Sequence, residues 1–311
     1  MKNIFLNDGL SNTIKSDNYE VFEFKNEAGH IKHIFTKRSI DKMMDGEVFY
    51  DLIPTPGFGG PVVINCIPDR KWDLVFEFTE AFQKYCLENN IVCEEVEFNS
   101  PFAHAVDFLD CYELEYVRDS YGMDLEKPLD QIGKEDLSKL WNAIDSGVEY
   151  RVIEGEAAIN VFKSFVHRSN KEMYKSFNQY LAITEEDGFD DCVAAELSFN
   201  NKVIAMNFSQ VQESMVYTLF HAKASRLQYF ETDNLLKCAL YLWAKEKGLQ
   251  KIWSPKEQLH SRMAIETLVA PICTGRKIWN EEVYQELCAA RSIDKRVQFF
   301  PAYRVILKNT Q

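Results

Sequence analysis

The stretch YDLIPTPGFGGP, residues 50–61, places prolines and glycines directly behind an apolar run that is typical of a strand, and the apolar run VVINCI begins at residue 62. Proline fixes φ and removes a backbone donor, whereas glycine admits positive φ and the close approach of another backbone or a ligand. The stretch is therefore a shaped turn. Its chemistry allows two interpretations: a tight hairpin or strand connection, or a loop that contacts a ligand with Phe58 as its wall.

Strand and helix patterns alternate around this turn in the first half of the chain. Apolar residues recur at helical spacing over 72–89, which predicts a helix with one buried face. Gly147 follows a later helical pattern as its expected C-cap. In chain order we expect strands at 48–53 and 61–67, the helix at 72–89, strands at 91–98 and 110–125, a turn at Lys127 and Pro128, and a helix at 134–146.

The second half predicts a comparable series. A largely helical segment is expected over 157–182, and Asn200 with Asn201 predicts a hairpin turn between two strands. The last predicted helix begins at an N-cap formed by Thr232 or Asp233 and ends at Gly248. The expected elements are the helix at 157–182, strands at 192–199, 202–210 and 214–224, the helix at 233–247 and a short strand at 251–254. Both halves fit a mixed α/β layer, so we expect two domains, residues 1–150 and 151–311.

Composition limits the function classes. The chain has 311 residues, an ordinary globular composition and a net charge of −13, which disfavours a nucleic-acid partner because attraction to a phosphate backbone needs a basic surface. Its eight cysteines form no C-x-x-C pair and no cluster with zinc spacing, so we expect reduced, mostly buried thiols and no metal. The N-terminus lacks the apolar core of a signal peptide and no apolar run is long enough for a membrane span, which predicts a cytoplasmic location.

Several separated stretches carry a resemblance to a known family. The opening stretch is similar to a strand followed by a Pro-x-Gly-aromatic-Gly-Gly turn. The others are FKSFVHRSNKEMYKSFNQY (162–180), VAAELSFNNKVIA (193–205), residues 217–247, ICTGRKIWNEEVYQEL (272–287) and FFPAYR (299–304). Together they resemble the Fem-type branch of the GNAT acyltransferase superfamily, in which two GNAT-like subdomains are fused in tandem. The resemblance implies α/β architecture, with a mixed β-sheet flanked by helices in each subdomain.

The resemblance also implies chemistry. GNAT enzymes catalyse attack by an amine on an acyl thioester, so the protein must hold the pyrophosphate of the donor, polarise a carbonyl and move protons. The donor would be acyl-CoA, with acetyl-CoA first among the candidates. The corresponding loop is residues 222–234, where amides at the start of the helix would face an accessible groove. The expected cofactor-binding residues are Lys223, Ser225, Arg226 and Asn234.

Candidate catalytic and substrate-binding residues follow from the same resemblance. His221 can carry a proton near neutral pH, Glu257 can accept one from an ammonium, and Tyr229 can give one to the departing thiolate. The expected acceptor-binding residues are Phe58, Gly59, Gly60 and Lys256. Each of these residue types also has a structural interpretation: a packed histidine, a core tyrosine, or an exposed ion pair at a surface turn. Arg304, set among aromatic residues, is expected to act as a structural clamp.

Two departures from the family pattern leave alternatives open. Trp253 to Glu257 stand where the family has a glycine triplet, and the loop at 222–234 contains no glycine. The main hypothesis is an N-acyltransferase acting on a small amine, such as an amino sugar or sugar nucleotide in cell-surface polysaccharide synthesis. The alternatives are a Fem-like transferase that takes an aminoacyl group from tRNA to a peptidoglycan precursor, and a non-catalytic GNAT-like protein that binds a ligand. We expect tRNA as a partner only under the first alternative, and we assign no oligomeric state.

Overall fold

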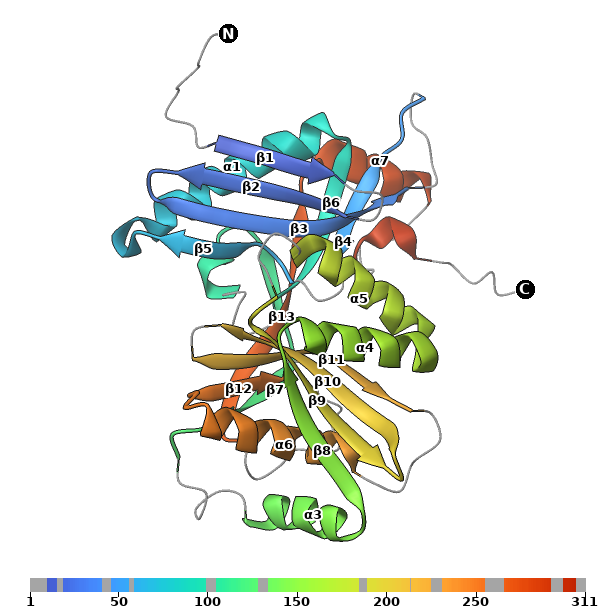
Figure 1. Cartoon of the computed structure of the whole chain (residues 1–311). Helices are drawn as coiled ribbons and strands as arrows, with labels where there is room; N and C mark the ends of the chain where they lie inside the picture. Colours follow the sequence, from blue (N-terminus) through green and yellow to red (C-terminus); the bar gives the residue numbers. More distant parts are fainter. Residues whose placement is uncertain are drawn as a thin grey trace, which may run out of the picture. The chain divides into compact units, whose positions relative to one another are not determined.

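The computed structural model of the chain (Figure 1) divides into two compact units. It describes residues 10–15, 19–40, 46–55, 59–98, 105–127, 134–184, 189–212, 214–224, 231–254, 266–291 and 299–305. The first unit comprises Met1–Arg118 and Ile272–Gln311, and the second comprises Asp119–Pro271. Each unit combines strands of a mixed sheet with flanking helices, so the predicted α/β fold class is confirmed.

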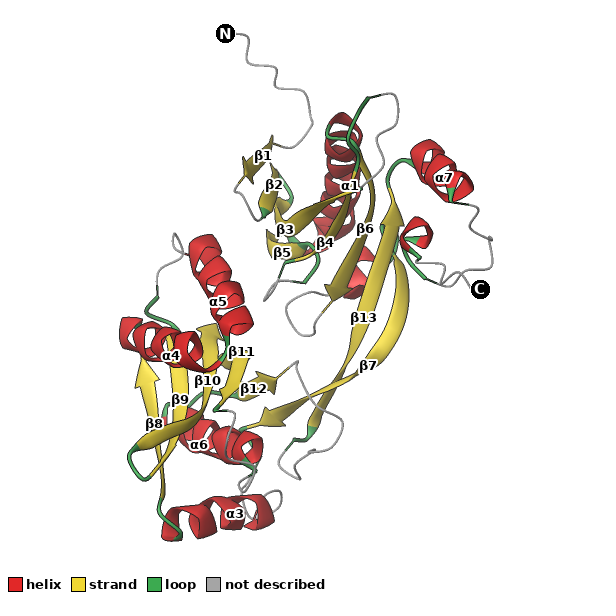
Figure 2. Cartoon of the chain, turned by 90° about the vertical axis from the view of Figure 1, so that its right-hand side faces the viewer, coloured by secondary structure: helices red, strands yellow, loops and turns green. Residues whose placement is uncertain are grey.

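The units differ from the predicted halves, because the boundary expected at residue 150 falls inside strand β8 (Val148–Glu154). The reason is strand β13 (Leu268–Ile278), which brings the chain back to the first unit and pairs antiparallel with β6 (Ile91–Phe98). Strand β7 (Glu113–Asp124) neighbours β13 (Figure 2). Each of these two long strands contains a boundary between the units.

The first unit is a sheet with the strand order β1-β2-β3-β4-β6-β13. Its remaining elements are β1 (Leu10–Lys15), β2 (Glu20–Asn26), β3 (Gly29–Ser39), β4 (Tyr50–Pro54), β5 (Val62–Cys66), η1 (Pro68–Arg70), α1 (Lys71–Glu88), η2 (Ala105–Phe108), α7 (Glu281–Ala290) and η4 (Ala302–Arg304). The predicted strands around the opening turn, the helix at 72–89 and the strand at 91–98 are confirmed.

The turn at 50–61 is a strand connection and not a hairpin. Strands β4 and β5 do not pair with each other, because both pair antiparallel with the same side of β3. Pro54 lies opposite Phe35 at the end of β4, and Val62 lies opposite Lys32 at the start of β5. The chain therefore leaves the edge of β3 at Pro54 and rejoins it at Val62. On its other side β4 pairs parallel with β6.

Helix α1 supplies the main core of the first unit. Its buried side chains are Leu74, Val75, Phe78, Phe82 and Cys86, which share one face because they recur at helical spacing. The Phe82 ring packs edge-to-face with the rings of Phe22 and Trp279, with ring centroids 5.0 Å and 5.3 Å apart. The opposite face of the sheet carries a smaller cluster in which α7 and η4 contribute Tyr284, Leu287 and Tyr303.

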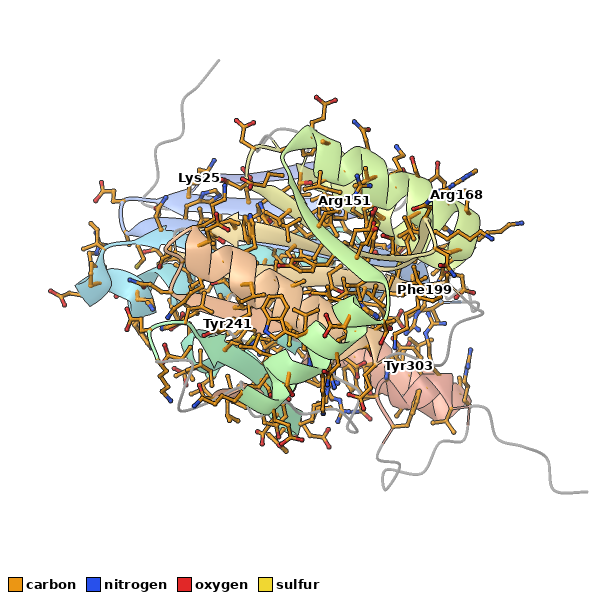
Figure 3. The ribbon with its side chains drawn as sticks, turned by 60° about the horizontal axis from the view of Figure 1, so that its bottom comes forward. Lys25, Arg151, Arg168, Phe199, Tyr241 and Tyr303 are labelled. Atoms are coloured by element: carbon orange, nitrogen blue, oxygen red, sulfur yellow. The ribbon has the colours of Figure 1, made fainter. Side chains whose placement is uncertain are left out.

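The second unit has the strand order β7-β12-β11-β10-β9-β8 with helices on both faces (Figure 1). Its elements besides β7 and β8 are α3 (Lys134–Asp145), α4 (Glu156–Ser169), α5 (Lys171–Thr184), β9 (Cys192–Phe199), β10 (Lys202–Gln212), β11 (Met215–Lys223), α6 (Thr232–Glu246) and β12 (Lys251–Ser254). Helix α6 packs with α3 over one apolar face, and its Tyr241 is labelled in Figure 3. Helices α4 and α5 cover the other face through Phe162, Phe177 and the strand residues Phe208 and Phe220.

The segment expected to be one helix at 157–182 is two helices. Asn170 is extended, with φ −153° and ψ 100°, and separates α4 from α5. Its side-chain Oδ1 accepts a hydrogen bond from the Met173 backbone N–H at 3.0 Å, so Asn170 caps the start of α5. Within the described ranges, the structure contains no helix that is both long enough and apolar enough to cross a membrane.

Candidate functional site

The candidate site lies in the second unit, where β11 ends and α6 begins. His221 and Lys223 are two positions apart on β11, so their side chains leave the same face of the strand. Both reach the carboxylate of Asp233 in the first turn of α6. His221 Nε2 lies 2.7 Å from Asp233 Oδ1, and Lys223 Nζ lies 2.6 Å from Asp233 Oδ2. One carboxylate thus joins the strand to the helix.

Asp233 is ionised throughout the physiological pH range. Burial by itself would raise the pKa of this carboxyl, but interactions with His221 and Lys223 outweigh burial and lower the pKa from 3.8 to about 2. The carboxylate also lies at the positive end of the α6 dipole, where a negative charge is stabilised. Asp233 therefore places a permanent anion at the start of α6.

A second contact fixes the ring of His221. Asn207 lies directly opposite His221 in the β10–β11 ladder, and its Oδ1 forms a hydrogen bond with His221 Nδ1. Asn207 is buried, whereas the side chain of His221 is 29% exposed. Nδ1 is hydrogen-bonded, and Nε2 lies close to the Asp233 carboxylate without a hydrogen bond among the described residues, so the ring lies between a strand residue and a helix residue.

The start of α6 differs from the predicted one. The N-cap is Glu231, and no side chain caps the first turn, so Thr232 and Asp233 are not the N-cap residues. Asp233 cannot serve as one because its carboxylate is turned to His221 and Lys223. Asn234 donates from Nδ2 to Glu231 Oε2 at 3.0 Å. Its Oδ1 is buried without a hydrogen-bond partner among the described residues.

The structure describes five of the predicted site residues. It brings His221 and Lys223 together at Asp233, and it places Asn234 next to Asp233 in the same helical turn. Gly59 and Gly60 belong to the first unit. Six others lie outside the described residues: Phe58, Ser225, Arg226, Tyr229, Lys256 and Glu257.

Gly60 has a packing role of its own. It is buried, and a Cβ placed on it would lie 2.8 Å from Cε1 of the Phe98 ring and 3.2 Å from Cβ of Val96. The absence of a side chain at Gly60 therefore lets the 50–61 connection pack against strand β6.

Sequence reasoning missed two buried polar clusters in the first unit. In one, Asp51 accepts hydrogen bonds from Arg38 Nε at 2.8 Å and from Arg304, which also donates to the Ser39 carbonyl at 2.7 Å. Tyr303, labelled in Figure 3, donates to the same carboxylate at 3.3 Å. The expected clamp role of Arg304 is confirmed, but its partner depends on the β3–β4 register, which the sequence does not display.

The other cluster surrounds Glu94, which is 1% exposed. Its carboxylate accepts hydrogen bonds from Tyr112 at 2.9 Å and Trp279 at 3.3 Å, and it also contacts His33 Nε2. The run IVCEEVEF places Glu94 where an alternating strand has a buried side chain, and that acidic residue in a core position was the available signal.

Comparisons with known proteins agree with this architecture. No protein-family model and no curated protein matches the chain. Among solved structures, FemX superposes with a TM-score of 0.52 and 10% identity, covering 89% of this chain and 90% of FemX. A C-terminal domain of a putative lysylphosphatidylglycerol synthetase from Agrobacterium fabrum gives 0.53 and 12%, covering 94% and 90%. The chain has the Fem-type GNAT fold. At these identities the likeness establishes the fold alone.

Proposed function

We propose that this protein is a cytoplasmic N-acyltransferase that moves an acyl group from acyl-CoA, acetyl-CoA first, to the amine of a small acceptor. The acceptor class is an amino sugar or sugar nucleotide used in cell-surface polysaccharide synthesis. The observation that supports this proposal is the position of His221, held between Asn207 and Asp233 at the start of α6 in a Fem-type fold. A fixed imidazole beside an uncapped helix N-terminus combines a proton carrier with an anion site.

In the proposed reaction the acceptor nitrogen forms a bond to the thioester carbon and the carbon–sulfur bond breaks. His221 takes the proton that the amine loses, with Asp233 stabilising the imidazolium that forms. Tyr229 gives a proton to the departing thiolate, and Glu257 serves as a second base for the incoming ammonium. Phe58, Gly59, Gly60 and Lys256 would hold the acceptor.

The donor pyrophosphate would bind at the first turn of α6, through Lys223, Ser225, Arg226 and Asn234. Asp233 opposes this binding, because its carboxylate already pairs with Lys223 and already occupies the positive end of the helix. Lys223 must therefore exchange a carboxylate for a phosphate oxygen when the donor arrives. Replacing Asp233 with asparagine should favour that exchange.

The same residue favours a second candidate, a non-catalytic protein that binds a ligand. An internal anion at the start of α6, in a loop without glycine, weakens the case for a bound pyrophosphate. Aminoacyl transfer from charged tRNA is the other alternative, and the likeness to FemX supports it while the net charge of −13 opposes it. Electrophoretic mobility of charged tRNA at low salt tests that alternative directly.

Thiol release from acetyl-CoA, followed with a panel of amino sugars and sugar nucleotides, tests the main proposal. We expect turnover with at least one acceptor. The rate of thiol release should be at least about 100-fold lower in His221→Asn, since general base catalysis contributes at least about that factor. His167→Gln is the matched control, because His167 is exposed on α4. Absence of turnover with every acceptor in the panel, together with ligand binding at α6, would favour the non-catalytic candidate.

A further inference from the structure

Helix α1 presents apolar side chains to solvent beside the 3-10 helix η2. Trp72 is 65% exposed and Phe76 49%, and their rings stack with centroids 5.3 Å apart. Val106 and Leu109, at η2, are 75% and 57% exposed. We call these four residues the α1–η2 apolar patch. Single exposed apolar residues are ordinary, but a stacked aromatic pair with further exposed apolar side chains nearby indicates an interaction site.

Contacts within the first unit place η2 along the first turns of α1. Lys71 Nζ lies 3.1 Å from Asp107 Oδ1, and the rings of Phe78 and Phe108 pack edge-to-face with centroids 6.0 Å apart. Thr79 interacts with the Cys111 side chain just after η2. Thr79 follows Phe76 by three positions, so it lies on the same side of the helix as the stacked pair. The exposed side chains of α1 and η2 therefore belong to one end of the unit.

The two segments that carry the patch are acidic. Residues 69–80 and 105–110 contain six acidic side chains and two basic ones. The acidic residues are Asp69, Asp73, Glu77, Glu80, Asp107 and Asp110. Both cations are already paired, Arg70 with Asp73 at 3.3 Å and Lys71 with Asp107 at 3.1 Å. The patch therefore combines apolar anchors with a negative rim.

We propose that the α1–η2 apolar patch docks a basic amphipathic helix of another protein. Its apolar face would cover Trp72 and Phe76, since a tryptophan already stacked on a neighbour loses little conformational entropy on binding. Its lysine and arginine side chains would face the acidic rim, which provides charge complementarity. A second copy of this chain would bring one acidic rim against another, and an anionic membrane would be repelled by the same rim.

A fluorescein-labelled helical peptide of leucine and lysine, with the leucines along one face, serves as the probe in an anisotropy titration. A labelled peptide of the same composition, with the leucines scattered around the helix, is the control. We expect wild type to bind the amphipathic peptide more tightly than the peptide with scattered leucines. The double variant Trp72→Ala/Phe76→Ala should bind the amphipathic peptide at least about tenfold more weakly. Trp141→Ala is the matched control because Trp141 is 48% exposed on α3, in the other unit. Equal binding of both peptides, or equal loss in both variants, would overturn the proposal.

A second variant tests the charge contribution without touching the aromatic pair. The triple variant Asp69→Asn/Glu80→Gln/Asp110→Asn should bind the amphipathic peptide more weakly than wild type. Added salt should lower the affinity of wild type for the peptide more than that of this variant. Circular dichroism melts should match wild type, since all the substituted side chains are at the surface. If wild type self-associates and Trp72→Ala/Phe76→Ala abolishes this, the patch binds a second copy of the chain, and the proposal is refuted. If wild type sediments with phosphatidylglycerol vesicles and the same variant does not, the patch binds a lipid surface, which also refutes the proposal.

Discussion

Asp233 Oδ1 lies 2.7 Å from His221 Nε2, which ties the start of helix α6 to the end of strand β11. Lys223 completes the arrangement from the same strand face, and Asn207 holds the opposite side of the histidine ring. One carboxylate thereby fixes a potential base and withholds a potential phosphate ligand.

Asp233→Asn should lower stability at neutral pH. The pKa of Asp233 falls from 3.8 to about 2 on folding, so its ionised form stabilises the native state above about pH 4. That contribution is lost as the pH falls towards 2, and it amounts to about 1–2 kcal/mol for a partly exposed group. Urea unfolding at pH 7 and at the lowest pH where the protein still folds measures the free energy of unfolding of both proteins. The difference between wild type and variant should be smaller at the lower pH. A difference that stays constant would mean that the ion pair does not stabilise the fold.

Arg304→Ala should destabilise the first unit by about 2–4 kcal/mol, because Asp51 is 1% exposed and would keep only Arg38 and Tyr303 as donors. Arg304→Lys should recover little, since a lysine cannot form the fork that reaches both Asp51 and the Ser39 carbonyl. Arg70→Ala is the control, as its ion pairs are exposed and should contribute less than about 1 kcal/mol. Similar losses for Arg304→Ala and Arg70→Ala in urea unfolding would contradict the clamp.

Gly60→Ala should cost about 1–3 kcal/mol through overpacking. The ring of Phe98 has glycines at both edges, with the Cβ position of Gly60 2.8 Å from its Cε1 and that of Gly275 2.6 Å from its Cε2. Phe98→Leu should relieve the crowding, so the double variant should be more stable than the sum of the single effects predicts. Strict additivity in thermal or urea unfolding would show that the ring is not the obstacle.

Glu94→Leu should cost about 3 kcal/mol or more, because Tyr112, Trp279 and His33 would all lose a buried acceptor. Tyr112→Phe removes a single donor and should cost about 1 kcal/mol. Glu95→Ala, on the same strand but partly exposed, should change stability by less than about 1 kcal/mol. Urea unfolding followed by tryptophan fluorescence measures all three. A Glu94→Leu variant as stable as wild type would mean that the core tolerates the orphaned donors.

Local sequence patterns predicted much of the fold. Asn200 and Asn201 adopt φ 51° and 58°, as the hairpin required, and Gly147 and Gly248 end their helices with φ 93° and 73°. The periodicity of α1 was sufficient because its buried face is continuous. Strand β13 carried no such pattern, since only Ile272 and Gly275 along it are buried, and the return of the chain to the first unit was missed with it.

The candidate site was predictable only in part. His221 and Lys223 could be chosen from the family resemblance and their residue types, but the role of Asp233 depends on how α6 packs against β11. The sequence predicted Thr232 or Asp233 as the N-cap, because capping is the local use of such residues at a helix start. Asn207 carries no sequence signal, since its contact with His221 arises from the β10–β11 register. In the same way, the sequence around residues 50–61 left a hairpin and a strand connection open, because pairing with β3 is not a local property.

Asp233→Asn should also separate donor binding from turnover. Removal of the carboxylate frees Lys223 and the positive end of α6, so the KM for the acyl donor should fall. His221 loses the group that orients it, so kcat should fall as well. Steady-state kinetics with acetyl-CoA and the best acceptor would show both changes. A rise in KM would mean that Asp233 helps to hold the donor.

Calorimetric titration of acetyl-CoA into wild type, Lys223→Ala and Lys202→Ala is the most direct test of an acyl-donor site at the start of α6. Lys202 is an exposed lysine on β10 and serves as the charge-matched control. We predict binding to wild type, affinity about tenfold weaker in Lys223→Ala, and unchanged affinity in Lys202→Ala. No heat with wild type, or equal affinity in all three proteins, would contradict an acyl-CoA site at this helix.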